Sequence, residues 1–139
     1  QNYALASERI PESLIPLKQM LYINGKINNK PLKIFIDTGA QMSIISHSYA
    51  KELGIDYLID YFCEGTAVGV GSAKIVGKIY YLDVDLGDGI ILPSGFSILE
   101  SSDLKIILGL NTMMSHGCNI NLKNKTLTFG GLSVKFDGY

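Results

Sequence analysis

The residues whose types and spacing could do chemistry are Asp37, Thr38 and Gly39, which follow the apolar run at residues 34–36. A carboxylate at the end of a buried strand is costly to desolvate unless it has partners. Asp37 therefore either caps a turn or is held in place for chemistry. The tripeptide by itself favours the capped turn, because the pattern is short and suits turn chemistry.

An aspartate of this kind becomes an effective catalyst when it is paired with a second carboxylate. Two carboxylates in close contact cannot both ionise cheaply, so they share one proton. One member then activates a water molecule while the other donates a proton to a substrate carbonyl. Thr38 supplies a hydroxyl that can hold a tight turn rigid, and Gly39 allows two such turns to approach without a Cβ clash.

The Asp-Thr-Gly tripeptide occurs once in the chain, and no other aspartate is followed by Thr-Gly or Ser-Gly. One chain therefore supplies half of a carboxylate pair. If Asp37 is catalytic in this way, the site must lie on a two-fold axis between identical chains. The count of one tripeptide thus predicts a homodimer with its active site at the dimer axis.

The elements that must position Asp37 are short strands. We expect residues 1–16 to form an arm or a short helical turn and residues 17–27 to form a strand. Two turns compete here, Asn24-Gly25 and Asn28-Asn29, and the second is preferred because it leaves a strand of useful length on each side.

After Gly39, residues 42–45 indicate another short strand. Ser46 or Ser48 can cap a helix that runs to about Leu53, where a glycine ends it.

Residues 61–86 indicate a long β-hairpin with a glycine-rich tip at residues 68–72. A dinucleotide-binding reading of these glycines fails, because the pattern breaks at Lys74 and a strand follows where a helix is needed. A hairpin tip that bends, and lets its backbone approach another molecule, accounts for them better.

The second half of the chain continues the pattern of short strands with regular turns, which favours a mostly-β barrel or sandwich with two short helices. Its expected elements are a strand at 90–99 that Pro93 interrupts as an edge or a bulge, a buried strand at 105–109, a helix at 112–116 capped by Asn111, and a hairpin of residues 118–122 and 126–129.

Composition narrows the possible functions of the 139 residues. Apolar residues make up 47% and charged residues 18%, as in a globular domain with a real core. The net charge of −1 and a single arginine, Arg9, argue against nucleic acid and membrane surfaces as partners. Cys63 and Cys118 form no metal-binding pattern, and we expect no metal. Reduced thiols, with no signal peptide and no apolar run of about 20 residues, favour a cytoplasmic protein.

Several motifs in this order resemble the retropepsin-like aspartic proteases, the retroviral protease family. The resemblance is closer still to the protease-like domain of the DNA-damage-inducible 1 proteins, which are ubiquitin-directed proteasome shuttles. It covers residues 17–130 and is carried by Met20-Leu21-Tyr22-Ile23-Asn24, Asp37-Thr38-Gly39-Ala40-Gln41-Met42-Ser43, Gly69-Val70-Gly71, Phe96-Ser97-Ile98-Leu99-Glu100, Leu108-Gly109-Leu110 and Cys118-Asn119-Ile120-Asn121-Leu122. The chain departs from the family pattern at Cys63-Glu64-Gly65 and Gly87-Asp88-Gly89.

The resemblance implies a closed, mostly antiparallel β-barrel that is active only as a homodimer. Asp37 would be the catalytic acid, supported by Thr38 and Gly39. A flap and one residue beside the acid would line the cleft and bind the peptide as an added strand. The implied substrate-binding residues are Ala40, Ala67, Val68, Gly69, Val70 and Gly71, and the implied structural residues near the carboxylate pair are Ile107, Leu108 and Gly109.

The resemblance also implies the domain limits and the partners. Residues 1–16 would be an N-terminal arm, 17–130 the protease domain and 131–139 a C-terminal tail. The partners would be a second copy of the chain and a peptide or protein substrate, in particular ubiquitinated proteins of the proteasome pathway. No cofactor is implied, and ubiquitin itself would be bound only through domains absent from this sequence.

Two other functions remain open on the same fold. One is a non-catalytic dimerisation or peptide-binding module, because a fold does not decide the function it carries. The other is a retroelement protease that processes a polyprotein. It would use the same catalytic chemistry on a different substrate.

Overall fold

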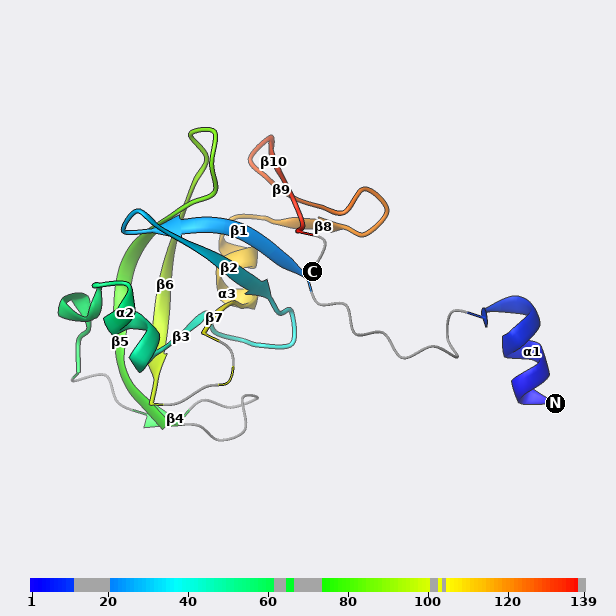
Figure 1. Cartoon of the computed structure of the whole chain (residues 1–139), viewed down its shortest axis with the longest axis horizontal. Helices are drawn as coiled ribbons and strands as arrows, with labels where there is room; N and C mark the ends of the chain where they lie inside the picture. Colours follow the sequence, from blue (N-terminus) through cyan, green and yellow to red (C-terminus); the bar gives the residue numbers. More distant parts are fainter. Residues whose placement is uncertain (12–20, 62–64, 67–73, 101–102, 104, 138–139) are drawn as a thin grey trace.

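The computed structural model describes residues 1–11, 21–61, 65–66, 74–100, 103 and 105–137. Its centre is a closed β-barrel (Figure 1). In the order of their pairing, the strands are β1 (Tyr22–Ile27), β2 (Lys30–Ile36), β7 (Ile106–Leu108), β3 (Ile44–Ser46), β6 (Ile91–Leu99) and β5 (Lys74–Asp85). A pairing of β1 with β5 closes the ring, and β4 (Gly65–Thr66) adds to the outer edge of β5. The structure confirms the predicted mostly-β barrel.

The barrel is antiparallel except at two pairings, one of which holds the strand that leads to Asp37. β2 pairs in parallel with β7, and β3 pairs in parallel with β6. Both pairings involve strands that are remote in sequence, so the end of β2 lies in the middle of the sheet rather than at an edge. The barrel therefore supports the start of the Asp37 loop on both sides.

The turn between β1 and β2 falls at Asn28 and Asn29, as the strand lengths predict. Both residues have positive φ, 53° and 63°, a conformation that asparagine tolerates better than most residues. The Asn28 side chain also donates from Nδ2 to the Leu53 carbonyl oxygen at 2.9 Å, which ties the turn to the end of the next helix. The two asparagines share a backbone conformation but differ in this contact.

Glycine substitution should separate these two contributions. Asn28→Gly should lower the free energy of unfolding by about 1 kcal/mol, because it removes the hydrogen bond to Leu53. Asn29→Gly relieves the positive φ and should change the free energy by less than about 0.5 kcal/mol. Urea denaturation of both variants measures the difference. Equal losses would mean that the side-chain contact contributes nothing.

The helices agree with the sequence in part. α2 (His47–Glu52) begins at Ser46, whose Oγ accepts from the Tyr49 amide as the expected cap. α3 (Leu110–Ser115) begins two residues before the predicted start, and its N-cap is Gly109. The prediction that Asn111 caps this helix is wrong, because Asn111 lies inside the helix and its side chain bonds to Ser43 instead.

Among the described residues, α1 (Asn2–Arg9) and η2 (Asp56–Leu58) are helical in addition to the two predicted barrel helices. α1 lies in the expected N-terminal arm and buries none of its residues. η2 is a short 3-10 helix that follows α2.

β5 and β6 form the long hairpin that crosses the barrel. The register shifts between the pairs Ile79–Phe96 and Leu82–Ser94, so β5 carries a bulge at Tyr80 and Tyr81. The expected interruption of β6 at Pro93 is wrong, because β6 is continuous. The expected edge is confirmed, because Pro93 pairs with Asp83 on one side and β3 reaches only Ser97 on the other. On the edge of β6 that faces away from β5, β3 does not extend as far as Pro93. The Pro93 carbonyl oxygen is bonded there by His116, which donates from Nε2 at 2.7 Å.

The predicted glycine-rich tip lies outside the described residues. Below it, Gly65 and Thr66 pair with Ile75 and Lys74, as the two arms of a hairpin would.

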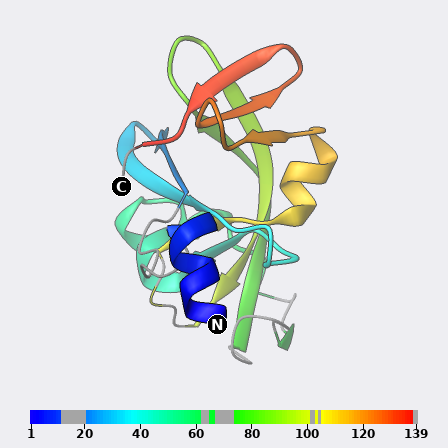
Figure 2. The ribbon, with the colours of Figure 1, turned by 90° about the vertical axis from the view of Figure 1, so that its right-hand side faces the viewer.

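A second sheet of three strands lies at the end of the barrel (Figure 2). It consists of β8 (Asn119–Asn121), β9 (Thr126–Phe129) and β10 (Leu132–Lys135). The β8–β9 hairpin is the predicted one. The tail expected at 131–139 is replaced in part by β10, which pairs with β9, and Asp137 then donates its amide to the Tyr22 carbonyl oxygen at 2.7 Å. Two local hairpins are sufficient to build this sheet.

The core is built from isoleucine, leucine and valine side chains that point inward from every barrel strand. Fully enclosed examples are Ile23, Ile34, Ile45, Val84, Ile98 and Leu108. Within the described part of the chain, no helix has the length and apolar character needed to cross a membrane.

Cys118, between α3 and β8, is a free and partly buried cysteine. Burial raises the pKa of its thiol, because a thiolate is disfavoured away from water. In a Cys63→Ser background, its alkylation by iodoacetamide at pH 8 should be slower than that of a cysteine peptide, because the thiolate is the nucleophile.

The raised pKa of Cys118 also links folding to pH. The unfolded chain releases the thiol proton at a lower pH than the folded chain does, so stability should fall as pH rises above the ordinary thiol pKa. This contribution is fully present below that pH.

In the alkylation test of Cys118, a rate equal to that of the cysteine peptide would contradict a desolvated thiol.

Candidate active site

Asp37 is the first residue after β2, and the barrel holds its backbone. Its amide donates to the Leu108 carbonyl oxygen at 3.0 Å, which extends the parallel pairing of Ile36 with Leu108 by one step. Ile36 and Leu108 are both buried, whereas Asp37 is partly exposed. The sequence thus places an acid where two buried strands end together.

The turn after Asp37 is closed by two hydrogen bonds. The Gly39 amide donates to Oδ1 of Asp37 at 2.9 Å, and the Ala40 amide donates to the Asp37 carbonyl oxygen at 3.2 Å. Thr38 and Gly39 are exposed at the tip of this turn. The structure therefore confirms that the Asp37 carboxylate caps a turn, and it leaves that carboxylate partly exposed.

Gly109 lies directly behind this turn, where the chain passes from β7 into α3. A Cβ atom on Gly109 would lie 2.5 Å from the Met42 carbonyl oxygen and 2.8 Å from that of Ala40. Real Cβ atoms do not approach backbone so closely, so only glycine fits here. The close approach lets Leu110 donate its amide to the Ala40 carbonyl oxygen at 2.8 Å.

A cluster of polar side chains beneath the turn was missed by sequence reasoning. Ser43 is 1% exposed and Thr112 is 4% exposed, and both hydroxyls bond to other side chains in the cluster, as do Ser94 and Asn111. One sequence signal was available, since Ser43 is a lone polar residue at the start of an apolar run. Its partners lie far away in the chain, and no local pattern indicates them.

The remaining predicted site residues fall into three groups. Ile107 and Leu108 are buried behind Asp37, as expected of structural residues. Ala40 is only 3% exposed and packs with Ile44, Leu99 and Ile107, so its side chain does not line an open cleft in the single chain. The flap residues, 67–71, lie outside the described residues.

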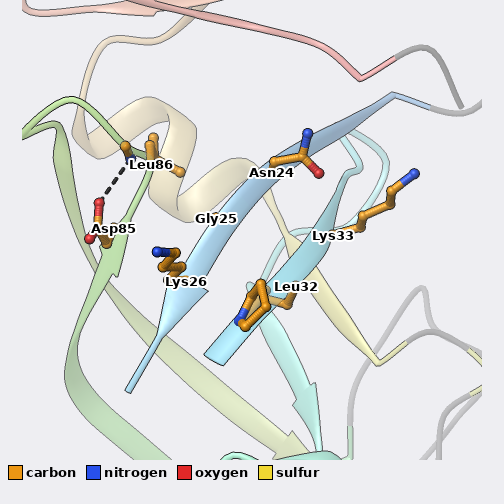
Figure 3. Close-up of a pocket in the computed structure, with 9 residues that line it drawn as sticks. Asn24, Gly25, Lys26, Leu32, Lys33, Asp85 and Leu86 are labelled. Atoms are coloured by element: carbon orange, nitrogen blue, oxygen red, sulfur yellow. Dashed lines mark hydrogen bonds between the residues drawn. The ribbon is translucent and has the colours of Figure 1, made fainter. Parts of the chain in front are cut away.

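A cavity of about 490 Å³ lies apart from Asp37, at the seam where β1 meets β5 (Figure 3). The seam is a single pairing, Lys26 with Asp85, and the cavity opens beside it. Its lining residues come from β1, β2 and the end of β5, and the residues around Asp37 are not among them. This cavity therefore lies at the narrow closure of the barrel and not at the Asp37 turn.

In the described part of the chain, no group of three or more histidine, cysteine, aspartate or glutamate side chains could hold a metal ion. The polar groups that the Asp37 turn presents are the carboxylate, the backbone amides of the turn and the exposed Thr38.

Comparison with known proteins places this geometry in a family. The family model described as aspartyl protease matches residues 11–121. Human Protein DDI1 homolog 2 is 42% identical over 130 residues, covering 94% of this chain and 32% of that protein. Rat Protein DDI1 homolog 1 is 41% identical over 130 residues, covering 94% of this chain and 31% of that protein. The chain thus spans about a third of the length of these curated relatives.

Solved structures agree with the sequence relatives. The retroviral protease-like domain of Ddi1 from Leishmania major superposes with a TM-score of 0.78 at 36% identity, covering 87% of this chain and 96% of that one. The EIAV protease, complexed with the inhibitor HBY-793, superposes with a TM-score of 0.52 at 18% identity and covers 78% of this chain. The second likeness shows the fold alone.

The matched model covers most of the chain and includes Asp37 and Gly109, so the chain belongs to the aspartyl protease family, with the retropepsin-like fold. Within that family it resembles the retroviral protease-like domain of the DDI1 proteins. The resemblance inferred from the motifs is confirmed.

Proposed function

We propose that this chain is an aspartic endopeptidase in which a water molecule is activated between the Asp37 side chains of two identical chains. The observation that carries the proposal is the single Asp37, presented on an exposed turn that two buried strands and Gly109 support from behind. Thr38, exposed at the tip of that turn, would bond across the dimer axis beneath the two carboxylates.

A second feature supports the dimer. β8 has a partner strand only on the β9 side in the described sheet, so its other edge is available for pairing. Leu122, at the end of β8, is 69% exposed. An open strand edge beside an exposed apolar residue is a ready template for pairing with another chain. We therefore propose that β8 contributes to the contact between the two copies.

The substrate we propose is an extended segment of a ubiquitinated protein of the proteasome pathway, cleaved in the cytoplasm. Residues 67–71 would cover the segment as a flap. We propose residues 17–130 as the protease domain, with 1–16 as an arm. The pairing of β10 with β9 argues for extending the domain from 131 to 137, because these residues are part of the folded sheet.

Mixing intact and disabled chains tests the shared site. When wild type is mixed with an equal amount of Asp37→Asn and the chains exchange, roughly one quarter of the pairs hold two intact Asp37 side chains. Activity on a denatured polyubiquitinated protein should then fall to about half of that of the same wild-type chains alone. Activity that follows the wild-type content in direct proportion would mean that one chain suffices and would refute the proposal.

A further inference from the structure

The loop that carries Asp37 is joined to the end of β7 and the start of α3 by three backbone hydrogen bonds. Besides the bond from the Asp37 amide to Leu108, the Leu110 amide donates to Ala40 at 2.8 Å and the Asn111 amide donates to Gln41 at 3.0 Å. The position of Asp37 therefore depends on where residues 108–112 are held. α3 has no side-chain cap at Gly109, so its start must be held by other contacts.

The Ser43 hydroxyl is the centre of those contacts. It accepts from the Gly109 amide at 3.0 Å and lies 3.0 Å from Oδ1 of Asn111. The Ser43 amide donates to the same Asn111 oxygen at 2.8 Å. Ser43 is 1% exposed, so water does not compete for these bonds. One buried side chain thus binds both the end of β7 and the first turn of α3.

Thr112 lies behind Ser43, and its hydroxyl can set the direction of the Ser43 hydroxyl proton. Oγ1 of Thr112 contacts Oγ of Ser43 and lies 2.7 Å from Oγ of Ser94. If Thr112 donates to Ser43, the Ser43 proton is directed at Asn111 and both Ser43 lone pairs are filled. Ser94 can then donate to Thr112, or to the Gly95 carbonyl oxygen at 2.9 Å.

We propose that Thr112 is a positioning residue for Asp37, acting through the Ser43 hydroxyl. The inference rests on the proposed function, because positioning has a meaning only for a reaction at Asp37. Without the Thr112 hydroxyl, Ser43 keeps an unfilled lone pair and its proton is no longer directed at Asn111. The joint between the loop and α3 loosens, and Asp37 shifts from the geometry that its partner carboxylate requires.

Thr112→Val tests this directly, because valine keeps the shape of threonine and removes the hydroxyl. We expect kcat to fall about tenfold with KM within about twofold, because geometry at the reacting centre is lost while the binding surface stays. Thr112→Ser restores the hydroxyl and should return kcat to within about threefold of wild type. Ser94→Ala is the matched control, because Thr112 can still bond to Ser43, and kcat should change less than about twofold.

A kcat of Thr112→Val equal to wild type would overturn the proposal. So would a Thr112→Ser variant as slow as Thr112→Val, because the loss would then come from packing. If Thr112→Val does not fold, Thr112→Ser and Thr112→Ala provide the second test, because these two variants differ only in the hydroxyl. In a Ser43→Ala background the two should have the same kcat, because no Ser43 hydroxyl remains to be oriented. A slower Thr112→Ala in that background would refute an action through Ser43.

Amide hydrogen exchange separates this inference from the proposed function. The Gly109 and Asp37 amides should exchange about tenfold faster in Thr112→Val than in wild type, with the β5–β6 amides unchanged. Thr112→Ser and Ser94→Ala should leave both amides protected. If exchange is faster only in Thr112→Val and the wild-type chain cleaves no substrate, the positioning role is supported and the proposed protease function is rejected. Unchanged exchange at both amides would overturn the positioning role, whatever the activity.

Discussion

Asp37→Asn should abolish peptide hydrolysis, with a loss of about a thousandfold or more in kcat/KM, while the chain stays folded. The asparagine amide has nearly the size of the carboxylate and still offers an oxygen to the Gly39 amide. It can neither accept the proton of the attacking water nor share a proton with a second acid. The substitution therefore removes the chemistry and keeps the turn.

The measurement is cleavage of a denatured polyubiquitinated protein, followed together with thermal unfolding. Asp88→Asn is the matched control, because Asp88 is exposed in a turn at φ 53°, a conformation that asparagine also accepts. Its activity should equal that of wild type. If Asp37→Asn and wild type cleave equally, Asp37 does not carry the reaction and the proposal fails. If both are inert on every substrate tried, the chain is a binding module on a protease fold.

Gly109→Ala should have the largest effect on stability, with a loss of about 3 kcal/mol or more in the free energy of unfolding. The backbone angles at Gly109, φ −101° and ψ −175°, are ones that alanine adopts easily. The cause is contact, because the new methyl group would lie 2.5 Å from the Met42 oxygen and 2.6 Å from its carbonyl carbon. These are backbone atoms, so no side chain can rotate away to relieve the clash.

Gly117→Ala separates the two ways in which glycine can be required. Gly117 has φ +60°, and no atom lies within 4 Å of the place that a methyl group would take, so alanine there should lose only about 1 kcal/mol. Urea denaturation of both variants measures the comparison. If Gly109→Ala folds as stably as Gly117→Ala, the loop and α3 can separate without loss, and the close approach does not position Asp37.

The parts of the fold that the sequence predicted well are those decided by neighbouring residues. The turn at Asn28 and Asn29 depends on two residues that accept positive φ, and the start of α2 depends on Ser46, three residues before the amide that it caps. Asn111 was misassigned for the converse reason. Asparagine before a helical segment is a good cap in isolation, but Gly109 lets the helix begin earlier, and Ser43 occupies the Asn111 side chain.

By itself the sequence identified the family, through several motifs in a fixed order, and it predicted from the count of one tripeptide that Asp37 needs a second copy of the chain. Tertiary structure alone decided how that acid is held. Ser43 and Thr112 are 69 residues apart, and Met42 meets Gly109 only after β2, β3 and β7 have joined one sheet. Such contacts leave no local pattern in the sequence, because each joins two distant segments that come together only when the whole barrel has formed.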